Sequence, residues 1–205
     1  MIKNIIFDLG GVIMTLSHPG GVKRFKELGV ADAEKQLDPY TQTGIFGDLE
    51  GGRITAEEFR LALSKMVGRE VTFEECKYCW LGYRADLPPR NLDVLKKLRR
   101  EGYRLILLSN TNPFMMDWAE SGEFDGEGNS IHHYFDALYM SYRVKAMKPS
   151  EYFFRYVLEK EGIKPEETLF LDDGPRNVAM ASDMGIHTFC PENGSDWTDE
   201  IYKYL

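Results

Sequence analysis

Reactive side chains follow four apolar segments that lie far apart in the chain. They are Asp8, the run Ser109-Asn110-Thr111, Lys148 and the pair Asp172-Asp173. Packing such charges together is costly unless a metal or a ligand compensates them. The set therefore indicates a binding site for a charged ligand, provided that the fold brings the four segments together.

The side-chain types suit phosphoryl transfer. Asp8, Asp172 and Asp173 would repel one another unless a hard cation lay among them, and oxygen ligands at this density favour Mg²⁺. Ser109 as a hydrogen-bond donor and Lys148 as a point charge could then hold phosphate oxygens. A carboxylate in line with phosphorus can act as a nucleophile, so Asp8 could form an aspartyl-phosphate that water hydrolyses.

Alternating strands and helices would position these residues. Apolar runs predict strands at residues 2–7, 104–108, 135–140, 168–171 and 186–189. Helices are predicted at about 91–101, from Pro113 onward, at 150–161 and at 175–184, with a short helical tail. This alternation favours an α/β fold with a doubly wound parallel sheet, which binds ligands at the carboxyl ends of its strands. The reactive residues lie at those ends.

The segment between the first two predicted strands has a helical pattern. An amphipathic stretch begins near Val22, and the sequences Thr55–Glu58 and Thr72–Glu75 have the spacing of capping boxes that start two further helices. We predict no strand between residues 17 and 88. The segment is therefore predicted to be a helical insert.

Four motifs together resemble those of the haloacid dehalogenase superfamily, a large group of aspartate-nucleophile phosphatases and their relatives. The motifs are Phe7-Asp8-Leu9-Gly10-Gly11-Val12, Leu107-Leu108-Ser109-Asn110-Thr111, Lys148-Pro149 and Phe170-Leu171-Asp172-Asp173-Gly174-Pro175-Arg176-Asn177. They occur in the family's order. The resemblance implies a three-layer Rossmann-like core at residues 1–14 and 86–205, with a small all-α cap at residues 15–85.

The resemblance also implies a role for each residue of the magnesium site. Asp8 would be the nucleophile and a metal ligand, the carbonyl of Gly10 a second ligand and Asp173 a third. Asp172 and Asn177 would orient the waters on the metal. The resemblance therefore implies Mg²⁺ as the cofactor.

The same resemblance implies a phosphate site and reveals one difference from the usual motif of the family. The resemblance implies that Ser109 and Lys148 bind phosphate, with the backbone amides of Leu9 and Asn110 as helpers. Phosphatases of this family usually carry an acid–base aspartate two residues after the nucleophile, and here that position is Gly10. General acid–base catalysis contributes roughly 10²–10⁴-fold to a rate. The first motif nevertheless resembles a branch that includes bacterial sugar-1-phosphate phosphatases.

Three functions are consistent with these residues. The leading one is a magnesium-dependent phosphatase of small phosphate monoesters, with sugar phosphates as the first class to test. The second is a catalytically weak or inactive protein with a binding or regulatory role, because Gly10 replaces the acid–base aspartate. The third is a metal-independent haloacid dehalogenase, which would not need the acidic pair Asp172-Asp173.

Composition restricts the partners. The chain has 205 residues and a net charge of −8, so no basic surface that would bind nucleic acid or an anionic membrane is predicted. No apolar run reaches the ~20 residues that span a bilayer, and three cysteines are too few for a disulfide framework. A cytoplasmic location and a small phosphorylated metabolite as partner are therefore predicted. The pattern does not indicate an oligomeric state.

Several other residues have weaker signals. Cys76 and Cys79 have zinc spacing but no second pair, so packing within a helix is the better interpretation. No role is predicted for His132 and His133. Substrate contacts from the cap are possible for four residues: His18, Tyr40, Phe46 and Arg53.

Overall fold

A parallel five-stranded sheet lies at the centre of the chain, in a computed structural model that describes residues 1–37 and 43–205. Its strands are β1 (Asn4–Phe7), β4 (Arg104–Ser109), β5 (Ala137–Met140), β6 (Thr168–Leu171) and β7 (His187–Phe189). Their order across the sheet is β5-β4-β1-β6-β7. Every predicted strand of the core is therefore present, with ends shifted by at most two residues.

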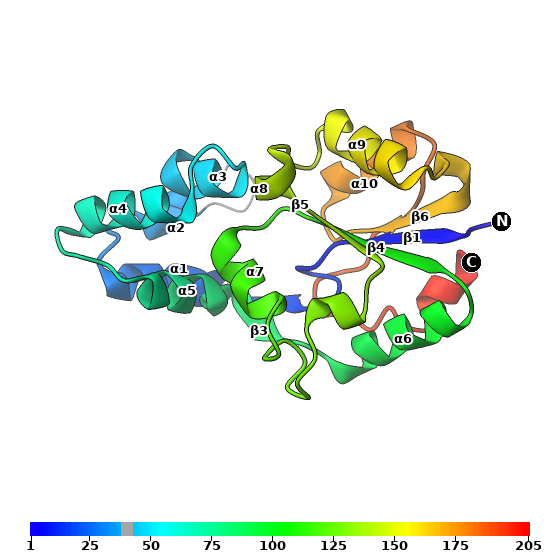
Figure 1. Cartoon of the computed structure of the whole chain (residues 1–205), viewed down its shortest axis with the longest axis horizontal. Helices are drawn as coiled ribbons and strands as arrows, with labels where there is room; N and C mark the ends of the chain where they lie inside the picture. Colours follow the sequence, from blue (N-terminus) through cyan, green and yellow to red (C-terminus); the bar gives the residue numbers. More distant parts are fainter. Residues whose placement is uncertain (38–42) are drawn as a thin grey trace.

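Helices cover both faces of the sheet. Successive residues of a strand point to opposite faces, so Ile5 and Phe7 pack on one side and Ile6 on the other. The first side is covered by α6 (Pro89–Arg100) and α7 (Pro113–Ala119), and the second by α9 (Glu151–Glu161) and α10 (Pro175–Asp183). Figure 1 shows α9 and α10 above the sheet and α6 below it. This confirms the doubly wound three-layer α/β fold.

The central strand determines where the site lies. β1 pairs with β4 on one side and with β6 on the other, so the chain order reverses next to β1. Ligands of doubly wound sheets bind in the crevice at the carboxyl ends of the strands, at this point of reversal. Asp8 directly follows β1 and is therefore at the centre of that crevice.

The helical segment has an apolar cluster of its own. Its helices are α1 (His18–Leu28), α2 (Ala33–Gln36), α3 (Gly44–Glu50), α4 (Ala56–Val67) and α5 (Phe73–Trp80). Aromatic rings fill the cluster, with Phe46 in edge contact with Phe25 and Phe59 at centroid distances of 5.1 and 5.5 Å. In Figure 1 these helices lie beyond the carboxyl ends of the strands. They are thus placed to cover the crevice.

Both predicted capping boxes are present. The hydroxyl of Thr55 accepts a hydrogen bond from Glu58 N, and the Glu58 carboxylate accepts one from Thr55 N. Thr72 and Glu75 repeat the arrangement at the start of α5. Cys76 and Cys79 are buried free thiols of α5 whose pKa burial raises to about 12. The packing interpretation of this pair is therefore confirmed.

The prediction that the segment contains no strand is wrong. β2 (Thr15–Leu16) and β3 (Arg84–Asp86) form a two-stranded antiparallel sheet where the chain leaves and re-enters the core. The strands are short, and Arg84-Ala85-Asp86 contains no β-branched residue, so pairing depends on the spatial proximity of the two ends. The division into a core at 1–14 and 86–205 and a cap at 15–85 stays a prediction. Within the described residues, no helix has the length and apolar character needed to cross a membrane.

Candidate active site

Asp8 and Lys148 form the centre of a buried charge cluster. Lys148 Nζ lies 2.9 Å from Asp8 Oδ2 and 2.5 Å from Asp172 Oδ2. Burial lowers the pKa of Lys148, but the carboxylates of Asp172 and Asp8 more than offset this and raise it above its ordinary value. Lys148 is therefore a fixed positive charge beside the predicted nucleophile.

Three carboxylates surround this ammonium. Oxygen atoms of Asp8, Asp172 and Asp173 lie within 4.8 Å of one another. Burial raises the pKa of Asp8 and raises that of Asp173 to about 6, and the neighbouring carboxylates add to both shifts. Three carboxylates and one ammonium leave two negative charges unbalanced, which one divalent cation would neutralise. The oxygen-only donor set therefore fits Mg²⁺.

Gly11 allows the third carboxylate to approach. A Cβ atom at this position would lie 2.1 Å from Asp173 Oδ2, and the backbone φ of +81° favours glycine. The Asp173 carboxylate thus lies directly against the loop that follows Asp8. Asp8, the Gly10 carbonyl and Asp173 are the groups that would hold the metal.

Asp172 and Asn177 are linked to each other rather than exposed to the cavity. Asp172 is fully buried, and its Oδ1 accepts hydrogen bonds from Gly174 N at 2.7 Å and from Asn177 Nδ2 at 2.9 Å. Its other oxygen bonds to Lys148. Asp172 therefore connects Lys148 to the start of α10, and the water-orienting role of Asp172 and Asn177 stays a prediction.

The predicted phosphate-binding residues surround the same centre. Asn110 uses its side chain to hold the backbone of Lys148: its Nδ2 donates to Lys148 O at 3.0 Å and its Oδ1 accepts from Lys148 N at 2.8 Å. Leu9 N donates to Asp8 Oδ1 at 2.7 Å. The Ser109 side chain lies at the end of β4 and lines the same cavity. Asn110 thereby holds the backbone from which the Lys148 side chain extends, a role that its sequence pattern did not indicate.

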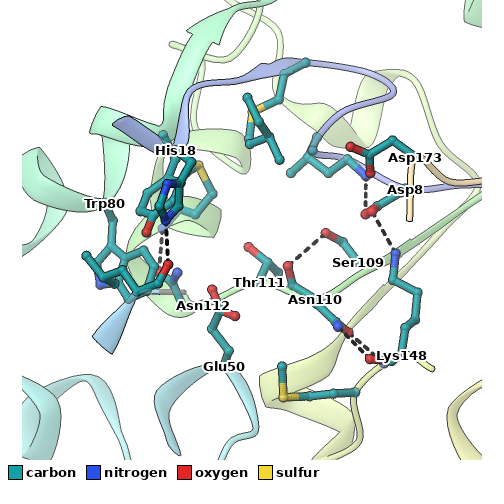
Figure 2. A pocket seen from close by; sticks show the side chains of 18 residues that line it. Asp8, His18, Glu50, Trp80, Ser109, Asn110, Thr111, Asn112, Lys148 and Asp173 are labelled. Atoms are coloured by element: carbon teal, nitrogen blue, oxygen red, sulfur yellow. Dashed lines mark hydrogen bonds and ion pairs between the residues drawn. The ribbon is translucent and has the colours of Figure 1, made fainter. Parts of the chain in front are cut away.

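A cavity of about 450 Å³ opens over these residues. Figure 2 shows Asp8, Ser109, Lys148 and Asp173 on its core side. The sequence did not single out Glu50, Trp80 or Tyr83 as residues of its cap side. Their positions depend on how the helical segment lies over the sheet, and no motif encodes that arrangement.

The four cap residues named from sequence have different positions. His18 lines the cavity, where its Nε2 lies 2.7 Å from the carbonyl oxygen of Leu37. Phe46 is fully buried in the cap cluster, and Arg53 lies on the surface, paired with Asp48 at 2.6 Å. Tyr40 lies outside the described residues. Of the described candidates, His18 alone is placed to touch a substrate.

A comparison with protein families decides the identification. A family model described as a haloacid dehalogenase-like hydrolase matches residues 2–185. The chain belongs to the haloacid dehalogenase-like hydrolase family. The resemblance inferred from the four motifs is thus confirmed for nearly the whole chain.

Three relatives of this hydrolase are similar over nearly their full length. A D-ribitol-5-phosphate phosphatase of Bacteroides thetaiotaomicron is 47% identical over 100% of this chain and 99% of its own. A solved HAD-like hydrolase of Porphyromonas gingivalis has a TM-score of 0.95 at 45% identity, covering 100% of this chain and 98% of its own. A HAD family enzyme of B. thetaiotaomicron, solved with magnesium and inorganic phosphate, has a TM-score of 0.89 at 36% identity and covers 98% and 99%.

Leu16 fills the space beside Gly10 in this hydrolase. A Cβ atom at Gly10 would lie 2.8 Å from Leu16 Cδ1 and 3.0 Å from Leu16 Cδ2, which is closer than normal van der Waals contact. The missing acid–base aspartate therefore leaves no gap, because an apolar side chain from β2 packs there. Gly10 and Leu16 are complementary in size.

This complementarity predicts how an aspartate at position 10 would behave. Gly10→Asp alone should reduce phosphatase activity and lower the melting temperature, because Leu16 crowds the new side chain. Gly10→Asp combined with Leu16→Ala should hydrolyse alkyl phosphates about 10-fold or more faster than Leu16→Ala, because general acid catalysis contributes 10²–10⁴-fold where its geometry is correct. Steady-state kinetics of the four proteins of this cycle measure the coupling. If Gly10→Asp changed the rate by the same factor with and without Leu16→Ala, Leu16 would not be what prevents an aspartate at position 10 from acting.

Proposed function

We propose that this protein hydrolyses monophosphate esters of small polyols, with D-ribitol 5-phosphate as the first candidate, through an aspartyl-phosphate on Asp8. At the coarser level the protein is a magnesium-dependent phosphatase that acts on small phosphate monoesters. The polyol substrate is supported by the 47% identity to a D-ribitol-5-phosphate phosphatase over the whole chain. One observation in the structure supports the chemistry most directly: Asp8 lies against the buried ammonium of Lys148 at the cavity.

The chain's own residues support a two-step reaction. A carboxylate oxygen of Asp8 attacks phosphorus, and the bond to the ester oxygen breaks as the leaving oxygen takes up a proton from solvent water and departs as the alcohol. Water then attacks the phosphorus of the aspartyl-phosphate, which restores the Asp8 carboxylate and releases inorganic phosphate. Lys148 and the Ser109 hydroxyl lie where they would hold phosphate oxygens through both steps. When bound, Mg²⁺ supplies positive charge for the same oxygens.

The helical segment limits the size of the substrate. Trp80 and Tyr83 line the cavity from α5 and the turn after it, and together with core residues they bound a space of about 450 Å³. Pockets of this size bind metabolites and enclose most of their surface. We therefore propose that residues 15–85 act as a cap that admits small esters and excludes folded phosphoproteins.

A panel of esters tests this function. We expect phosphate release from D-ribitol 5-phosphate with excess Mg²⁺, and a loss of at least about 100-fold in kcat when the metal is removed by a chelator. Readdition of Mg²⁺ should restore the rate. The assay measures inorganic phosphate and includes glycerol 3-phosphate, hexose phosphates and an aryl phosphate.

Two other results would change the conclusion. Release of chloride from 2-chloropropionate in the presence of chelator would favour a dehalogenase. Magnesium binding without turnover of any ester in the panel would favour a binding or regulatory protein, for which Gly10 is the motivating residue.

A further inference from the structure

The cavity has two chemically different ends. Asp8 and Lys148 form the end where the phosphoryl group would react. Figure 2 shows His18, Glu50 and Asn112 at the other end, with the Glu50 carboxylate directed into the space between the two. The alcohol part of a bound ester would therefore extend toward Glu50, so this end determines which alcohols fit.

Glu50 is a nearly buried acid at the last residue of α3. Its exposed fraction is 6%, which is unusual for a glutamate. Burial raises the pKa of the Tyr83 phenol above its ordinary value, and the charge of Glu50 adds to that shift. The acidic side chain thus influences its neighbours at this end of the cavity. Glu50 interacts with other residues of the protein and also lines the cavity.

Two other polar side chains, His18 and Asn112, line the same cavity. The carbonyl of Leu37 can only accept, so His18 Nε2 donates to it. Asn112 Oδ1 accepts from Phe114 N and Met115 N, both at 3.1 Å, which leaves the Asn112 amide Nδ2 as a donor. Glu50 as an acceptor and Asn112 Nδ2 as a donor, both in the lining of this cavity, suit hydroxyl groups, because a hydroxyl both donates and accepts.

The charge distribution disfavours a second anion here. Among the described residues that line the cavity, Lys148 is the only lysine or arginine, and it is held by Asp8 and Asp172 at the reaction end. A carboxylate or second phosphate at the far end would face Glu50 without a balancing lysine or arginine from those residues. Like charges in a desolvated site repel strongly and so reduce binding.

We propose that Glu50 is a specificity residue that accepts hydrogen bonds from the hydroxyl groups of a polyol monophosphate and rejects esters whose far end is anionic. This inference rests on the proposed function, because it assigns the phosphoryl group to the Asp8 end. The inference adds a selectivity for the alcohol part of the ester: esters of neutral, hydroxylated alcohols bind, and esters of acidic alcohols do not.

The test compares two ligands that differ at one carbon. D-ribitol 5-phosphate ends in a CH₂OH group, and D-ribonate 5-phosphate ends in a carboxylate at the same position. Equilibrium binding of both with Mg²⁺ is measured by calorimetry in the Asp8→Asn protein, which should not cleave them. We expect ribitol 5-phosphate to bind at least about 10-fold more tightly than ribonate 5-phosphate.

When Glu50→Gln is added to Asp8→Asn, the affinity for ribitol 5-phosphate should fall about 10- to 100-fold, because a hydrogen bond to a charged group is replaced by one to a neutral amide. The affinity for ribonate 5-phosphate should rise, because the repulsion between Glu50 and the carboxylate of the ligand is removed. Inorganic phosphate should bind within about 2-fold of the parent. Glu74→Gln, at an exposed acid in the first turn of α5, is the matched control and should change none of these affinities.

The binding measurement separates this inference from the proposed function. Equal affinities for the two esters, or an equal loss of affinity for the esters and for inorganic phosphate in Glu50→Gln, would overturn the role of Glu50. Turnover by the unmodified protein decides the proposed function independently, because the binding experiment does not depend on hydrolysis.

Discussion

Replacing Asp8 with asparagine is expected to abolish phosphate release, with a decrease in kcat of at least about 10⁴-fold. Asparagine has nearly the size of aspartate and could keep the hydrogen bond from Leu9 N to the side-chain oxygen. It lacks the negative charge and nucleophilicity that an attack on phosphorus needs. The measurement is a single-turnover assay at saturating substrate and Mg²⁺, with acid-quenched protein examined for covalent phosphate.

Two controls make the loss at Asp8 interpretable. Asp93→Asn replaces an exposed aspartate of α6 and should leave the rate unchanged. The melting temperature of Asp8→Asn should be equal to or above that of the parent in chelator, because one of three clustered carboxylates is removed. Activity in Asp8→Asn above about 1% of the parent would assign the nucleophile to another group.

The pH dependence of this stability difference has a definite sign. Burial raises the pKa of Asp8 in the folded protein, so the folded state favours the protonated carboxyl. An acid with a raised pKa destabilises the folded state progressively as pH rises from its ordinary value toward the raised one. The melting temperature of Asp8→Asn should therefore exceed that of the metal-free parent by more at pH 7.5 than at pH 5.

The core residues of the site could be predicted from sequence because of a general property of parallel sheets. Asp8, Ser109 and Asp172 each directly follow or end a short apolar strand, and adjacent parallel strands bring their carboxyl ends together. Once the strands pair, their ends lie together, so these residues could be placed in the site without knowing the conformations of the loops. The capping boxes at Thr55 and Thr72 could also be predicted from sequence, because each hydrogen bond joins residues only three positions apart.

Other features depend on contacts between distant segments. Leu16 packs beside Gly10 from β2, and β2 pairs with β3, which comes about 70 residues later in the chain. Glu50 reaches the cavity because the whole helical segment is positioned over the sheet. The side chain of Asn110 holds Lys148 across 38 positions of sequence. No short pattern encodes such contacts, so the sequence indicated the reacting groups but not the residues that position them or bound the substrate.

Lys148→Met is expected to have the second largest effect, on both activity and stability. Methionine keeps much of the apolar stem but removes the ammonium that lies between Asp8 and Asp172. Removing one partner of a buried ion pair costs about 3–5 kcal/mol, because the remaining charges are left unpaired. Removing a cation that stabilises developing charge should also lower kcat by about 10²–10³-fold. Thermal unfolding in chelator and steady-state kinetics in Mg²⁺ measure the two losses.

Mg²⁺ distinguishes a local charge effect from a general packing defect at Lys148. If the loss of stability comes from unbalanced carboxylates, saturating Mg²⁺ should raise the melting temperature of Lys148→Met by more than it raises that of the parent, because it restores positive charge within the same carboxylate cluster. Lys148→Arg keeps the charge but places a larger planar group where one Nζ atom meets two carboxylates, so it should lose activity with less loss of stability. Lys164→Met, at an exposed lysine after α9, should match the parent in both measurements. A melting temperature of Lys148→Met that responds to Mg²⁺ no more than the parent's would show that the ammonium does not balance the carboxylate cluster.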